Sequence, residues 1–165
     1  MLNWYAIHVR SRHEFVVQAQ LFKKDTVTFL PVVKRLRQWK DRKKLISFPL
    51  FPGYLFVKIP IDPEQFLSVL KVRGVLNFVC AEPGYPTPVP NEEINSLNLL
   101  LESDKAIDVF PHLKEGTRVR VKRGTLHGAE GVLEKKDDQY IFLVNINILG
   151  RSVGVRINAE DLEAI

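Results

Sequence analysis

Residues 1–101 alternate between short apolar runs and segments in which apolar residues recur at helical spacing. Aromatic and β-branched residues fill 4–9 and 54–59, as is typical of buried strands. Ser11 can cap a helix, with Glu14 at the capping-box spacing. The pattern predicts these elements in order: a strand at 4–9, a helix at 11–24, a strand at 27–33, a hairpin of 36–39 and 45–48, a strand at 54–59, a helix at 63–71, a strand at 75–80 and a helix at 91–101. This order predicts an α+β fold with a mainly antiparallel sheet flanked by helices.

From Gly116 onward the pattern changes to short alternating strands separated by turns. The predicted strands are 118–122, 131–136, 139–145, 152–157 and 162–165. Five strands are too few to hide two sheet edges, which favours closure into a small SH3-like β-barrel. Weak periodicity, many charges and Pro111 predict a linker at 102–114. We therefore expect an N-terminal domain at 1–101 and a barrel domain at 115–165.

Charge is distributed unevenly along the chain. Residues 1–90 carry 14 Lys/Arg against 6 Asp/Glu, a net charge of +8, and residues 91–165 carry 10 against 13, a net charge of −3. A basic half suggests a phosphate-bearing partner, and a mildly acidic half suggests a protein partner. On charge alone, the alternative is the solvated surface of an ordinary basic protein.

The reactive residue types argue against an enzyme or a metalloprotein. Cys80 is the only cysteine, so one chain can form neither a disulfide nor a cysteine-based metal site. The four histidines are scattered, and no Walker loop, G-x-S-x-G or H-E-x-x-H motif is present. We expect no catalysis, no cofactor and no metal. The absence of a signal-peptide pattern and of an apolar run near the ~18 residues that span a bilayer predicts a cytoplasmic protein, which we expect to be a monomer.

The segment Phe48–Val57 is the most distinctive apolar stretch. It reads Phe-Pro-Leu-Phe-Pro-Gly-Tyr-Leu-Phe-Val. Tyr54 and Phe56 share one face of a strand, and Leu55 and Val57 take the other. Because both faces are apolar, either helices cover both of them, or one face receives a helix of a partner in an aromatic groove.

A strongly basic segment precedes it. Only one carboxylate, Asp41, accompanies these seven cations: Lys34, Arg35, Arg37, Lys40, Arg42, Lys43 and Lys44. The interleaved Trp39 could stack on a nucleic-acid base. The alternative is a solvated hairpin tip whose lysines discourage edge-to-edge pairing.

These landmarks resemble the NusG family of transcription elongation factors, which includes specialised paralogues of the RfaH type. The resemblance covers almost the whole chain and rests on these segments: Trp4-Tyr5, 51–56, 73–75, the 86–90 loop, and 116–131, which looks like the family's KOW motif. It implies a bacterial elongation factor with processivity or antitermination activity, of the specialised branch. A housekeeping NusG that supports Rho-dependent termination, and an RNA-binding KOW protein of the ribosome, are the alternatives.

The resemblance also implies where partners bind. The N-terminal domain of such proteins docks on the clamp helices of the largest catalytic RNA polymerase subunit, which we expect here at Phe51, Pro52, Tyr54 and Phe56. Ser68 stands where RfaH-type paralogues touch the opposite polymerase pincer, although 65–68 does not reproduce their Thr-rich run.

Nontemplate DNA is the second partner that the resemblance implies. Arg10 and Arg73 match basic positions that touch it in RfaH-type proteins, whereas Val16 replaces a third one. The expected nucleic-acid set is Arg10, Arg12, His13, Arg37, Lys40, Arg42 and Arg73. A set of ordinary surface charges is the alternative.

The KOW barrel of such proteins recruits a further factor, such as Rho or a small-subunit ribosomal protein. Leu126 and His127 occupy one loop of the predicted barrel, and Ile148 and Leu149 another. Apolar residues on turns suggest a small partner surface, with closure of the barrel's open end as the alternative. RfaH refolds this domain as a helical hairpin, but the β-prone runs 140–144 and 153–157 predict a stable barrel here.

Overall fold

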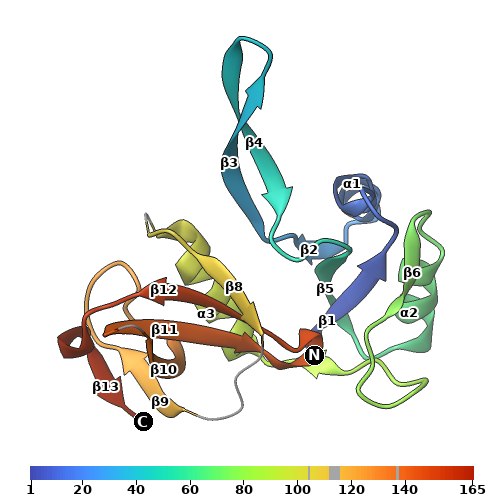
Figure 1. Cartoon of the computed structure of the whole chain (residues 1–165). Coiled ribbons are helices and arrows are strands. Elements are labelled where there is room, and N and C mark those ends of the chain that lie inside the picture. Colours follow the sequence, from blue (N-terminus) through green and yellow to red (C-terminus); the bar gives the residue numbers. More distant parts are fainter. Residues whose placement is uncertain (104, 112–115, 137) are drawn as a thin grey trace. The chain divides into compact units, whose positions relative to one another are not determined.

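The computed structural model describes residues 1–103, 105–111, 116–136 and 138–165 (Figure 1). They form two compact units, Met1–Pro88 and Val89–Ile165, each described by itself below. Both units contain mainly antiparallel sheet, and helices accompany the strands, which confirms the predicted α+β class.

The first unit contains a main sheet, two helices and a separate hairpin. Its elements are β1 (Leu2–Val9), α1 (Glu14–Lys23), β2 (Val27–Phe29), β3 (Val32–Trp39), β4 (Arg42–Pro49), β5 (Tyr54–Pro60), α2 (Pro63–Leu70), β6 (Val75–Phe78) and the short β7 (Pro88–Val89). The main sheet has the order β2-β5-β1-β6, with β7 beside β1, and β1 pairs antiparallel with both β5 and β6.

Helices α1 and α2 pack on one face of this sheet, here called the first face. That face carries alternate residues of the two central strands, among them Ile7, Leu55 and Val57. Val17 of α1 and Val69 of α2 join them in one core cluster. The predicted division of side chains between the two faces of this strand is therefore confirmed, because Leu55 and Val57 lie on the opposite side of β5 from Tyr54 and Phe56.

The predicted start of α1 is wrong. The helix begins at Glu14 with His13 as its N-cap, and no side chain caps it. Arg12 has a φ of 64°, a left-handed conformation that helical residues do not adopt, so the chain still turns at Ser11 and Arg12. Glu14 does not close a capping box, and its buried carboxylate accepts a hydrogen bond from the Gly53 N–H instead (3.4 Å).

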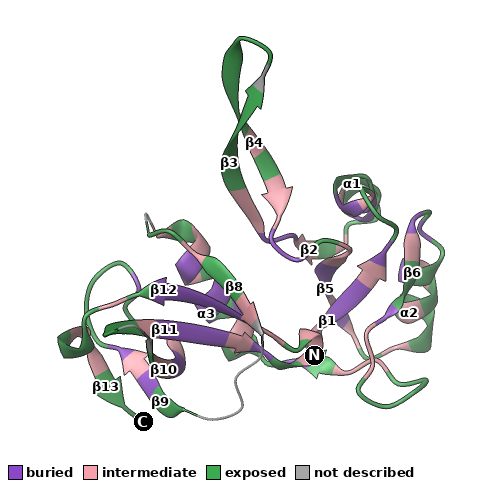
Figure 2. Ribbon diagram, in the orientation of Figure 1, coloured by how far each residue is buried: buried purple, intermediate pink, exposed green. Residues whose placement is uncertain are grey.

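Strands β3 and β4 form a two-stranded sheet of their own, here called the hairpin. The Leu30-Pro31 break separates it from β2, where the sequence predicted one interrupted strand. Trp39 pairs with Arg42, which leaves a two-residue turn of Lys40 and Asp41. Above its base the hairpin is almost entirely exposed (Figure 2).

The second unit is a six-stranded antiparallel sheet with one long helix. Its elements are α3 (Asn91–Glu102), β8 (Asp108–Pro111), β9 (Thr117–Val121), β10 (Glu130–Lys136), β11 (Gln139–Ile146), η1 (Asn147–Leu149), β12 (Arg151–Arg156), η2 (Ala159–Asp161) and β13 (Leu162–Ala164). The strand order is β13-β9-β10-β11-β12-β8. Strands β9 to β13 match the five predicted strands to within two residues, and the sheet is consistent with the predicted KOW barrel.

Two segments differ from the predicted division of the chain. Helix α3, expected in the N-terminal domain, falls in the second unit, where the buried Ser96 hydroxyl accepts a hydrogen bond from the Glu130 N–H of β10 (3.0 Å). Residues 108–111, expected in the linker, form β8, which pairs with β12. Residues 104 and 112–115 of the predicted linker lie outside the described residues.

Candidate functional site

The face of the N-terminal sheet opposite α1 and α2, here called the second face, is lined with aromatic rings. Phe29 of β2 stacks on Phe56 of β5, with ring centroids 6.0 Å apart. His8 of β1 stacks on Tyr54 of β5 at 5.0 Å, and Trp4 meets the edge of Phe29 at 6.3 Å. Two groups of contacting rings, Trp4, Phe29 and Phe56 in one and His8 and Tyr54 in the other, therefore lie on this face across three neighbouring strands.

The turn before β5 is fixed to β1 and α1. Gly53 has a φ of 87°, which glycine adopts without strain. Its N–H donates to Glu14, and its carbonyl accepts from the Val9 N–H at 2.8 Å. These bonds set where Pro52 and Tyr54 lie relative to the end of β1.

The structure places the four expected polymerase-contact residues of this region at different depths. Phe51 and Phe56 are 1% and 0% exposed, Tyr54 is half-buried and Pro52 is exposed. Phe56 lies on a strand flanked by β1 and β2 and is stacked on Phe29. Phe51 and Phe56 are thus shielded from solvent, and the accessible members of the expected contact are Pro52 and Tyr54.

A basic pocket lies between the start of α1 and the turn before β6. It is a surface cavity of about 430 Å³ lined by His13, Val16, Gln20, Lys24, Lys71, Val72 and Arg73. Every formally charged lining residue is a cation, and no carboxylate is among the lining residues. Such a pocket favours an anion.

Two of the expected nucleic-acid residues, His13 and Arg73, meet in this pocket. Arg10 is held close to them in the fold, because its backbone N–H donates a hydrogen bond to the Gly74 carbonyl at 2.8 Å. Arg12 is exposed and does not line the pocket. Thus the structure brings together residues from both ends of the N-terminal domain sequence.

Sequence reasoning missed three polar members of the pocket: Gln20, Lys24 and Lys71. A signal existed for two of them, since positions 13, 16, 20 and 24 follow the three-to-four-residue spacing of one helix face. The Lys24 ammonium also donates to the Ser68 carbonyl at 3.0 Å and lies 3.4 Å from its hydroxyl. Ser68, expected at the opposite polymerase pincer, therefore borders the basic pocket.

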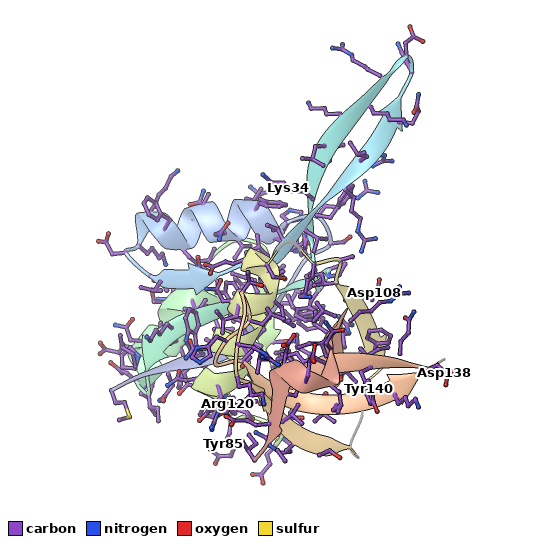
Figure 3. All side chains as sticks on the ribbon, turned by 90° about the vertical axis from the view of Figure 1, so that its left-hand side faces the viewer. Lys34, Tyr85, Asp108, Arg120, Asp138 and Tyr140 are labelled. Atoms are coloured by element: carbon purple, nitrogen blue, oxygen red, sulfur yellow. The ribbon has the colours of Figure 1, made fainter. Side chains whose placement is uncertain are left out.

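The hairpin carries the remaining expected nucleic-acid residues, Arg37, Lys40 and Arg42. All three are exposed, as are Lys34, Arg35, Lys43 and Lys44. Among the described residues no ion pair involves any of these seven cations. Figure 3 shows the hairpin side chains standing off the ribbon, with Lys34 labelled. The side chain of Trp39, expected to stack on a base, lies outside the described residues.

The expected partner residues of the barrel also lie at different depths. Leu126 is 2% exposed, because a tight turn closed by the Ala129 N–H and the Leu126 carbonyl (2.9 Å) holds it in the interior. His127 is exposed, and Ile148 and Leu149 are half-buried in η1. The accessible part of this expected surface is therefore His127 and η1.

Glu130 organises the charged surface of β9 and β10. Its carboxylate accepts a hydrogen bond of 2.8 Å from the guanidinium of Arg120, which lies directly opposite on β9. A longer ion pair of 3.9 Å joins the same carboxylate to Arg118. The hydrogen bond and the charge of Glu130 raise the pKa of Arg120 above its usual value.

The described part of the chain shows neither a metal-ligand cluster nor a membrane-spanning helix. Those residues contain no group of three His, Cys, Asp or Glu that could hold a metal ion. None of their helices is both long and apolar enough to cross a bilayer.

Comparison with known proteins identifies relatives along the whole chain. The family model described as "Transcription termination factor nusG" matches residues 2–98. Proteins named "Transcription termination/antitermination protein NusG" are 26% identical in Borreliella burgdorferi (98% of this chain and 98% of that protein) and 29% identical in Staphylococcus aureus (99% and 96%). A solved structure titled "Domain interaction in Thermotoga maritima NusG" superposes with a TM-score of 0.56 at 24% identity, covering 100% of this chain and 98% of that one, and supports the fold.

Proposed function

The chain belongs to the NusG family, and on that premise we propose that it is a bacterial transcription elongation factor that binds RNA polymerase and promotes processivity and antitermination. The observation that carries the proposal is the family match over 2–98, the residues that build the aromatic second face and the basic pocket. Its place of action would then be the cytoplasm, where bacterial transcription occurs.

The proposed polymerase contact is the second face, with the clamp helices as its occupant. Both helices of the first unit pack on the first face, and Tyr54 on the second face and the neighbouring Pro52 remain accessible to a partner. A helix pair laid on an aromatic surface is a common mode of recognition. Tyr54 and Pro52 would make direct contact, and the buried Phe51 and Phe56 would support them from beneath. Ser68 is retained in this proposal as a contact to the opposite pincer.

The proposed DNA contact is the basic pocket, with nontemplate DNA as the ligand. Arg10, His13 and Arg73 come from the expected set, and Lys24 and Lys71 join them in the structure. Phosphate contacts of this kind make affinity fall as salt rises. Arg12 and the hairpin residues Arg37, Lys40 and Arg42 belong to the same proposed DNA-binding activity.

The barrel would recruit a second protein through His127, Ile148 and Leu149, with Leu126 shaping the loop from inside. Rho and a small-subunit ribosomal protein are the two candidates. The names of the relatives, termination/antitermination proteins, favour a second candidate function for the whole chain: a housekeeping NusG that also supports Rho-dependent termination.

Pull-down with core RNA polymerase tests the polymerase contact. We expect Tyr54→Ala to weaken binding about tenfold, the loss of one strong aromatic contact. Tyr85→Ala is the matched control, because Tyr85 is 73% exposed in the loop between β6 and β7 and is not among the contacting rings described for the second face. Normal binding by a folded Tyr54→Ala protein would refute the contact. Phe56→Ala is a poor probe, because removing a buried ring perturbs the fold itself.

Transcription with purified components separates the two functions. Reduced pausing without stimulation of Rho supports the specialised factor, whereas stimulated Rho release supports the housekeeping one. Absence of both effects, together with absence of polymerase binding, would reject the proposed function as a whole.

A further inference from the structure

The two faces of the hairpin are chemically different, and the strand register defines them. One face, here called the cationic face, carries Arg35, Ile46, Arg37, Lys44 and Arg42 above its base, and by register it also includes position 39. The other face, here called the leucine face, carries Lys34, Ser47, Leu36, Leu45, Gln38 and Lys43. Side chains alternate between faces along each strand, so this division follows from the pairing.

The cationic face contains a pair of like charges in directly opposed positions. Arg37 lies directly opposite Lys44 in the register, and like charges in directly opposed positions destabilise a strand pair. Both side chains are exposed, and no carboxylate among the described residues pairs with them. An arrangement that costs stability and has no internal partner indicates an external polyanion.

We propose that the cationic face of the hairpin binds double-stranded DNA, with the ribbon lying along the duplex. This deepens the DNA-binding part of the proposed function and rests on it. Residues on one face of a strand recur about every 6.8 Å, which is twice the ~3.4 Å axial spacing of phosphates on one DNA strand. Arg35 and Arg37 on β3, and Arg42 and Lys44 on β4, are therefore spaced widely enough for each to contact a separate phosphate.

The two-stranded shape of the hairpin favours duplex over single-stranded nucleic acid. A two-stranded ribbon fits the B-DNA major groove, which is about 12 Å wide. Proteins that bind single strands combine cations with exposed aromatic rings on which bases stack. Trp39 pairs with Arg42 in the register, so a single-stranded ligand is kept as the competing outcome of the test.

The test compares two charge-matched variants of the full-length protein. Arg37→Gln/Lys44→Gln removes two cations from the cationic face, and Lys34→Gln/Lys43→Gln removes two from the leucine face. Binding to a random-sequence DNA duplex, without polymerase, is followed by fluorescence anisotropy across a salt series. We expect the first variant to lose about tenfold in affinity at low salt and about 1.8 in the slope of log affinity against log salt, the value for two lost phosphate contacts. The second should lose much less.

A second measurement keeps folding and binding apart. Because the first variant removes a like-charge opposition, hydrogen exchange of the β3 and β4 amides should be unchanged or slower than in the parent. Equal losses in both variants would overturn the assignment to one face. A loss confined to a single-stranded oligonucleotide would overturn the duplex assignment. Since the assay contains no polymerase, either failure leaves the contact at Tyr54 to be judged by its own experiment.

Discussion

Two antiparallel strand pairs of this protein use charge in opposite ways. In β9–β10, Arg120 lies opposite Glu130 and donates to it at 2.8 Å. In the hairpin, Arg37 lies opposite Lys44, and neither has an ionic partner among the described residues. The same backbone arrangement thus carries an attractive pair in one unit and a repulsive pair in the other. Cross-strand charge in the second unit supports the sheet, whereas charge in the hairpin remains available to a ligand.

The two regions differ equally in how they bury apolar side chains. In the second unit Phe142, Leu143 and Val153 are each 0% exposed. On the hairpin Leu36 and Leu45, directly opposed across the strands, are 68% and 56% exposed. Packing therefore holds the barrel strands together, while backbone hydrogen bonds and one exposed apolar pair hold the hairpin strands.

The largest expected effect comes from truncating a leucine in each region. Leu143→Ala should destabilise the second unit by about 2–5 kcal/mol, because it leaves a cavity in a packed core. Leu36→Ala, the same chemical change, should cost the hairpin less than about 1 kcal/mol, the range of a single cross-strand pair. Hydrogen exchange resolved by residue is the appropriate measurement, since the two units need not unfold together. Comparable losses at both sites would remove the distinction between packed barrel and open hairpin.

A smaller effect is expected from deleting one hydroxyl group. Ser96 of α3 is 3% exposed and accepts from the Glu130 N–H, so Ser96→Ala leaves a backbone donor without its partner at a cost of about 1–3 kcal/mol. Ser47 on the hairpin is exposed, and Ser47→Ala should stay within about 0.5 kcal/mol. Amide exchange in β10 reports the first change. An unaltered β10 in the Ser96 variant would show that this hydrogen bond contributes little to the second unit.

The sequence was most informative where structure depends on local pattern. Period-two alternation and turn residues located β9 to β13 to within two residues, because each strand carries its own signal. The start of α1 was misplaced because the left-handed conformation of Arg12 has no signature in a residue of that type. Strand β8 was missed because its only support is pairing with β12, distant in the sequence, and because Pro111 argued against a strand.

The candidate site was predictable in part for the same reason. Strand alternation placed Tyr54 and Phe56 on one face, but it left open whether that face is covered, and only the structure shows that Phe56 is buried. His13 and Arg73 were both singled out, yet only the fold shows that they line one pocket with Lys71. Lys24 could have been found, since helical spacing from His13 places it on the same side of α1.

The smallest expected effect comes from reversing a single charge in the opposed pair of the hairpin. Lys44→Glu gives the hairpin the kind of pair that β9–β10 has, an arginine opposite a carboxylate. Replacing repulsion by attraction should stabilise the strand pair by about 0.2–1 kcal/mol, visible as slower amide exchange in β3 and β4.

Lys43→Glu is the matched control for this last change, because Lys43 lies opposite Gln38 and has no like charge to relieve. We expect it to leave hairpin stability nearly unchanged. If Lys44→Glu stabilises the hairpin while weakening duplex binding, the repulsive pair is retained for its ligand and not for the fold. If it destabilises the hairpin, the opposed cations do not repel one another in the folded protein, and the contrast between the two strand pairs has no energetic basis.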